Sequence, residues 1–249
     1  MPLKILAVIP ARGGSKSIPR KNIQPLCGRP LIGWKIMAAR ESGAFDRIIV
    51  STDDGEIAGI AEKYGAEVPF LRPPELAEDA TPTLPVLQHA VRFLVERQSY
   101  HPDAVMLLEP TSPGVRPIHF REAADLLMAT GSDSVVSVME VPACFNPHWI
   151  FRMDDTRRMA LFLGGPIKSR IKRRQDLPPG YSPNGGIYLL RPKFLFDPDE
   201  PNLYGHHVVG YVMDAKYSID IDTPNDWVAA EEKMKKILQE RSGESTNYA

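Results

Sequence analysis

The sequence has few cysteines and no long apolar run, and each absence excludes a class of protein. Cys27 and Cys144 stand far apart and form no C-x-x-C motif, which argues against a cysteine metal site or a redox pair. We expect both to be small apolar fillers. No apolar stretch approaches 18 residues, and no long hydrophobic stretch with a cleavage site follows Lys4. We therefore expect a cytoplasmic protein that makes no membrane contact.

The chain also has almost no net charge. The formal net charge is −1, which provides no general attraction to nucleic acid, so we expect no nucleic-acid partner. The 249 residues include 43% hydrophobic residues, an ordinary share for a globular chain, and fit a single α/β domain. We place this domain at residues 1–240, and we expect the small polar stretch 241–249 to be a frayed tail.

Apolar runs typical of strands alternate with amphipathic stretches typical of helices. This alternation predicts a mostly parallel sheet with helices on both faces, in which ligands bind at the carboxyl ends of the strands. The predicted strands are 5–9, 47–51, 66–70, 104–108, 134–138 and 186–190. The predicted helices are 31–42, 55–64, 84–97, 117–130 and 224–239.

The alternation breaks between residues 142 and 183. This segment is rich in proline and contains a basic run at 168–174. We interpret it as an excursion from the sheet that contacts a second subunit.

The segment after the first predicted strand reads IPARGGSKSIPRKNI and has the composition of a phosphate-binding loop. Adjacent Gly13 and Gly14 allow close backbone approach and inward N–H groups, and Pro10 and Pro19 stiffen both ends. The cations that would face a nucleoside triphosphate are Arg12, Lys16, Arg20 and Lys21. A basic loop of this kind can also be a solvated turn.

The loop fits neither common phosphate motif, because it lacks both G-x-x-x-x-G-K-[ST] and G-x-G-x-x-G. It resembles instead the N-terminal IPARGGSK-x-IP-x-KN signature of the acylneuraminate cytidylyltransferase family of sugar nucleotidyltransferases. The resemblance implies a Rossmann-like fold with a small dimerisation element, whose partner subunit helps to close the sugar site. It assigns nucleotide binding to Arg12, Gly13, Gly14, Ser15, Lys21 and Asn22.

The segment Ile219-Asp220-Ile221-Asp222 places two carboxylates on one face of an extended chain and two isoleucines on the other. Adjacent carboxylates repel unless a cation holds them, which favours Mg²⁺ shared with substrate phosphates. The aspartates could also only cap or solvate the junction with the last helix, where Thr223 is the expected N-cap. The family carries a matching metal-binding DID segment, and we expect Asp222 to be the more direct ligand.

Four further stretches extend the resemblance along nearly the whole chain. Arg72-Pro73 with Thr81 matches a nucleotide-binding segment, in which the arginine is implied to read the cytosine edge. Glu109-Pro110-Thr111-Ser112-Pro113 matches the family's QPTSP, with glutamate in place of the glutamine that is implied to touch the sugar. RRQ-x-LP and NGAIY-like stretches assign sugar binding to Arg173, Arg174, Gln175 and Asn184 together with Glu109, Thr111 and Ser112.

The resemblance implies an enzyme that joins CMP from CTP to the anomeric hydroxyl of a nonulosonic acid and releases pyrophosphate. Arg12, Lys21 and Asp222 would be its catalytic residues, and the active form would be a homodimer. Two alternatives remain. The sugar could be legionaminic, pseudaminic or a deaminated acid, or Kdo, and the chain could be an inactive module that binds nucleotide sugars.

Overall fold

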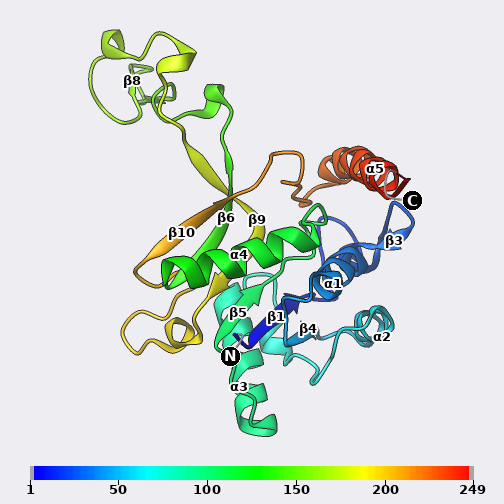
Figure 1. Ribbon diagram of the computed structural model, residues 1–249. Coiled ribbons are helices and arrows are strands. Elements are labelled where there is room, and N and C mark those ends of the chain that lie inside the picture. The colour runs from blue at the N-terminus through cyan, green and yellow to red at the C-terminus, as the bar shows by residue number, and fades with distance from the viewer. Residues whose placement is uncertain (1–2, 247–249) are drawn as a thin grey trace.

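The computed structural model describes residues 3–246 and shows one twisted six-stranded sheet between two layers of helices (Figure 1). The strand order is β10-β6-β9-β5-β1-β4, and β9 alone among these runs antiparallel to its neighbours. The sheet strands are β1 Ile5–Pro10, β4 Arg47–Ser51, β5 Ala104–Leu107, β6 Ser134–Glu140, β9 Tyr181–Leu190 and β10 Val208–Val212. The predicted fold class, a mostly parallel sheet with helices on both faces, is confirmed.

The alternating side chains of β1 show how the two helix layers are held. Ile5, Ala7 and Ile9 pack in the apolar cluster that includes α1 and α4, while Leu6 and Val8 pack in the cluster that includes α3. All five side chains are buried, because a central parallel strand is covered on both faces. The helices are α1 Leu31–Ser42, α2 Gly55–Tyr64, α3 Thr83–Gln98, α4 Pro117–Thr130 and α5 Pro224–Thr246.

The excursion between β6 and β9 stands away from the sheet (Figure 1). Beyond a bulge at Val136/Val138, the two strands continue as an antiparallel arm to the pair Glu140 and Tyr181. The arm carries a lobe with a small hairpin of β7 Phe151–Met153 and β8 Met159–Leu161. A second two-residue hairpin, β2 Pro25–Leu26 and β3 Arg29–Pro30, precedes α1.

Three sequence predictions differ from the structure. Within the predicted strand 66–70 only Glu67 forms a bridge, and a second isolated bridge follows at Leu71, because Pro69 has no N–H to donate to a ladder. Cys144 is exposed and therefore does not fill the core. The last helix continues to Thr246 rather than ending at 239, and residues 247–249 of the predicted tail lie outside the described part of the chain.

Within residues 3–246, no helix is both long enough and apolar enough to cross a membrane.

Candidate active site

The carboxyl ends of β1, β4 and β5 meet at one edge of the sheet, where a cavity of about 690 Å³ opens. Segments that are far apart in the sequence supply its walls. Ten of the predicted site residues line it: Arg12, Ser15, Lys21, Asn22, Arg72, Thr81, Glu109, Thr111, Asp220 and Asp222. The cavity therefore lies where the strand–loop pattern predicts a ligand site.

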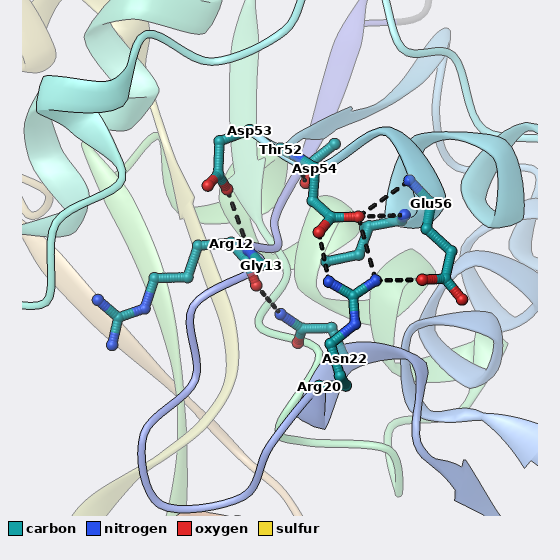
Figure 2. A network of polar contacts seen from close by, with 9 residues as sticks. Arg12, Gly13, Arg20, Asn22, Thr52, Asp53, Asp54 and Glu56 are labelled. Atoms are coloured by element: carbon teal, nitrogen blue, oxygen red, sulfur yellow. Dashed lines mark hydrogen bonds and ion pairs between the residues drawn. The ribbon is translucent and has the colours of Figure 1, made fainter.

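The glycine loop is held in shape by the turn between β4 and α2 (Figure 2). The Gly13 N–H donates to Asp53 Oδ1 at 3.0 Å, and Asn22 Nδ2 donates to the carbonyl of Arg12 at 3.0 Å. Gly13 is required by close approach, since a Cβ there would lie 2.7 Å from Asp54 Oδ2. The Gly13 N–H is thus bound to protein, which differs from the expectation that it faces a phosphate.

Arg20 contacts residues that hold the glycine loop in place, and it does not line the cavity. Its guanidinium pairs with the carboxylates of Asp54 and Glu56, and its backbone has a left-handed φ of 57°. Asp54 in turn caps α2 by accepting from the N–H groups of Glu56 and Ile57. The hydrogen bond from Arg20 lowers the pKa of Asp54 below its usual range. The expectation that Arg20 contributes charge to phosphates therefore does not match its contacts.

Two of the cations that line the cavity, Arg12 and Lys16, share one acidic partner. Arg12 Nη1 lies 2.8 Å from Asp79 Oδ1, and Lys16 pairs with the other oxygen of the same carboxylate. All three side chains line the cavity. Hydrogen bonding from Lys16 lowers the pKa of Asp79, so the carboxylate is ionised at neutral pH. Asp79 thus neutralises part of the positive charge that a phosphate group would meet.

Lys21 connects the glycine loop to the acidic segment. Its Nζ donates to the carbonyl of Ile221 at 2.8 Å and lies 3.3 Å from Asp222 Oδ1. The Lys21 side chain is mostly buried, and it joins the glycine loop to the segment that carries the two aspartates.

The acidic segment has the predicted alternation. Ile219 and Ile221 are buried, whereas Asp220 and Asp222 line the cavity. The segment is extended but belongs to no ladder, and Ile221 N donates to the carbonyl of Thr111 at 3.1 Å. Burial and the adjacent Asp222 carboxylate raise the pKa of Asp220. This arrangement is one that a bound cation would stabilise.

Thr223 is the N-cap of α5, as predicted. Its Oγ1 accepts from Asp226 N at 3.3 Å, and Asp226 Oδ2 accepts from Thr223 N at 2.7 Å. This reciprocal pair has the geometry of a capping box, which fixes the direction in which the acidic segment enters the helix.

Glu109 lies on the cavity wall beside Gly185 of β9. An ideal Cβ on Gly185 would lie 3.3 Å from Glu109 Oε2, and the left-handed φ of 67° also favours glycine there. Burial raises the pKa of Glu109, and the nearby Asp220 raises it further.

The structure uses two predicted sugar-binding residues for internal contacts. Ser112 is buried and donates to the carbonyl of Gly185 at 2.8 Å. Asn184 is buried and donates to Ser218 Oγ at 2.9 Å, while its Oδ1 accepts from Ser137 and from the N–H of Gly186. Both residues support the strand beside the cavity, and neither lines it.

Arg72 is buried and reaches the cavity wall from the segment before α3. Its Nε donates to Ser51 Oγ at 3.1 Å, and Nη2 donates to the Ser51 carbonyl at the end of β4. Burial, together with the positive charge of Arg12, lowers the pKa of Arg72 to about 10. Thr81 Oγ1 donates to the Glu75 carbonyl at 3.3 Å. These contacts anchor the segment that carries Asp79.

The remaining predicted sugar-binding residues lie in the excursion, away from this cavity. Arg173 Nε pairs with Asp176 at 2.8 Å, and Gln175 is exposed. Arg174 lines a second cavity of about 530 Å³ at the base of the excursion, together with Glu140, Asn146 and Leu177. Within one chain, the structure does not bring these residues to the first cavity.

Sequence analysis assigned no role to two residues of the site, Asp53 and Asp79, whereas it already placed Lys16 among the cations expected to face the triphosphate. Asp53 holds the glycine loop, and nothing in its local sequence indicates this contact. The available signal for Asp79 was its position at the end of the stretch 72–79, which begins with the predicted nucleotide-binding residue Arg72.

Comparison with known proteins gives consistent results. A family model described as cytidylyltransferase matches residues 6–244. The chain is 37% identical over 245 residues to the CMP-N,N'-diacetyllegionaminic acid synthase of Legionella pneumophila, covering 96% of this chain and 99% of that protein. It is 33% identical to the pseudaminic acid cytidylyltransferase of Campylobacter jejuni, covering 98% and 99%.

Two further matches differ in length or in identity. The N-acylneuraminate cytidylyltransferase A of Danio rerio is 36% identical, covering 94% of this chain and 51% of that longer protein. Among solved structures, a CMP:2-keto-3-deoxy-manno-octonic acid synthetase complexed with CTP matches with a TM-score of 0.66 at 16% identity, covering 94% and 99%. This last likeness supports the fold alone.

Proposed function

Because the chain belongs to the cytidylyltransferase family, we propose that it transfers CMP from CTP to the anomeric hydroxyl of a nonulosonic acid, releasing pyrophosphate. The observation that carries the proposal is the convergence of the glycine loop, Arg72, Glu109 and the Asp220/Asp222 pair on one cavity. Anion-binding cations and an acidic pair in one site suit transfer between a triphosphate and a hydroxyl.

The chain's residues position the reactants and compensate charge. Arg12 and Lys16 bind the phosphate chain, and the nucleotide replaces Asp79 as their partner. Lys21 lies beside Asp222 and neutralises charge on the α-phosphate side as pyrophosphate leaves. The sugar hydroxyl attacks the α-phosphorus in line, and this class of reaction depends on orientation and electrostatic stabilisation more than on covalent participation by the protein.

The acidic pair fits Mg²⁺. Two carboxylates side by side, one with a raised pKa, are hard oxygen donors whose two negative charges face the single ammonium of Lys21. Among the described residues, no group of three or more His, Cys, Asp or Glu side chains could hold a metal, so phosphate oxygens and water would complete the shell. Mg²⁺ held by Asp220 and Asp222 would supply charge neutralisation for the phosphates.

The sugar is a nonulosonic acid on the basis of the family relatives, whose names specify legionaminic, pseudaminic and N-acylneuraminic acids. An inactive nucleotide-sugar binding module is disfavoured, because Lys21, Asp220 and Asp222 are all retained at the cavity.

We further propose that the active form is a homodimer built through the excursion. Large apolar side chains are exposed on its lobe, which favours a protein contact. They are Phe145, Met153, Met159, Phe162, Leu163 and Ile167. In such a dimer, Arg173 or Arg174 would approach the partner's sugar site, which they do not reach within one chain.

The reaction consumes CTP, an intracellular nucleotide, which supports the proposed cytoplasmic location. The net charge of −1 supports the absence of nucleic-acid and membrane partners.

The test is pyrophosphate release from CTP with Mg²⁺ across a panel of nonulosonic acids and Kdo. We expect CTP-dependent release with at least one nonulosonic acid, and a matched reaction without sugar gives the background. Nucleotide binding without release with any sugar in the panel would favour the binding module instead.

A further inference from the structure

Lys35 is a buried ammonium that the proposed reaction does not use. It lies in α1, its side chain is 1% exposed, and its Nζ has no hydrogen-bond partner among the described residues. An unpaired buried cation costs several kcal/mol unless a nearby charge compensates it. A lysine on this mainly apolar face of α1 is therefore unfavourable unless nearby charges stabilise it.

The two carboxylates that act on the charge of Lys35 both line the cavity. Glu109 and Asp220 both favour its charged form, against the burial that lowers the pKa of Lys35 to about 7. Conversely, Lys35 favours the ionised form of Glu109, against burial and against Asp220. The third titratable neighbour, His119 on α4, is itself buried, which lowers its pKa to about 4, so it adds no positive charge at neutral pH.

Lys35 does not line the cavity, whereas Glu109 and Asp220 do. It therefore acts on a ligand only through these two carboxylates. Glu109 and Asp220 bring two negative charges together in a partly buried place, which is unfavourable unless cations compensate them, and both Lys35 and Lys21 favour the ionised form of Glu109. An amide, the group that stands in the resembled QPTSP motif, would need no such partner.

We propose that Lys35 is a positioning residue whose buried ammonium compensates Glu109, so that a carboxylate replaces an amide on the sugar side of the cavity. A carboxylate only accepts hydrogen bonds, whereas an amide also donates. The pair therefore selects a sugar acid that presents a donor, a hydroxyl or an N–H, to Glu109. This selection rests on the proposed function, but the charge pairing does not.

The pairing is tested by thermal unfolding of the ligand-free protein in four forms: wild type, Lys35→Met, Glu109→Gln and the double variant. Methionine approximates the length of lysine without its charge. We expect each single variant to unfold at least about 3 °C lower and the double variant to recover most of the loss, since each single change leaves one charge uncompensated. Lys63→Met, at an exposed position of α2, is the control and should change nothing.

The selection is tested by kinetics of the same variants. We expect the KM for the native sugar to rise about tenfold in Lys35→Met and in Glu109→Gln, with the KM for CTP nearly constant, because a hydrogen bond to a charged group is altered. The double variant should prefer a different sugar of the panel. Additive losses in melting temperature would overturn the pairing, and an unchanged sugar ranking would overturn the selection. Absence of turnover with every sugar in the wild type would contradict the proposed function and leave the unfolding result standing.

Discussion

At the scale of single residues, the cavity contains side chains of opposite charge that form ion pairs with one another, and a bound ligand would replace these partners. Lys21 contacts Asp222, and Asp79 contacts Arg12 and Lys16. Each of these pairs is made of cavity-lining residues, so the proposed nucleotide and metal ion would replace protein partners rather than fill empty space. Preformed pairs of this kind keep charged side chains oriented at low cost.

Asp222→Asn tests the acidic pair. We expect turnover to fall at least about 100-fold at saturating Mg²⁺, because losing one anionic ligand weakens the metal that neutralises the phosphates. The melting temperature should change little, since Asp222 is exposed. Pyrophosphate release measured across a Mg²⁺ titration checks this, with Asp125→Asn on the exposed face of α4 as the matched control. Wild-type rate at low Mg²⁺ would remove the metal assignment.

The adjacent glycines allow a matched pair of substitutions. Gly13→Ala places a methyl group 2.7 Å from Asp54 Oδ2 and must displace the cap of α2, whereas Gly14→Ala meets nothing within 4 Å. We expect Gly13→Ala to destabilise by about 1–3 kcal/mol and Gly14→Ala by less than about 0.5 kcal/mol. Urea unfolding measures both. Equal losses would mean that the loop does not have the packing described.

At the scale of elements, Asp79 connects the segment before α3 to the glycine loop. Asp79→Asn should release Arg12 and Lys16 for phosphate and lower the KM for CTP by up to about fivefold, the value of one exposed ion pair. Glu78→Gln, the exposed neighbouring acid, should leave it unchanged. Initial rates against CTP concentration measure the effect, and a higher KM in Asp79→Asn would show that the carboxylate assists binding instead.

The sequence predicts the type and the bounds of an element correctly where the spacing of apolar residues and the helix stop signals agree, as for α1, α2 and α4. It failed at 66–70, where Pro69 interrupts an apolar run, and at β10, an edge strand whose residues alternate between exposed and half-buried. The site segments were predictable because their motifs are local. The partners of Gly13, Arg20 and Arg72 were not, because those contacts join segments that only the folded sheet brings together.

At the scale of the whole molecule, one chain does not bring its basic excursion to its own cavity. Arg173 pairs with Asp176 and Arg174 lines the second cavity, while the lobe exposes Phe162 and Leu163. A twofold assembly through this lobe would bury the apolar side chains and allow the arginines of one subunit to serve the other. The prediction is that each active site is composite.

Mixing two inactive variants tests the composite site. Asp222→Asn removes a proposed metal ligand, and the Arg173→Ala/Arg174→Ala variant removes the cations proposed to reach the partner's site, so a mixed dimer would contain one complete site out of two. We expect the unfolded-and-refolded mixture to regain up to about a quarter of wild-type turnover, because random pairing makes half of the dimers mixed. Pyrophosphate release measures the recovery, and sedimentation gives the oligomeric state. Phe162→Ser/Leu163→Ser should shift the protein toward monomer and reduce activity in parallel, whereas a fully active monomer would contradict the dimer.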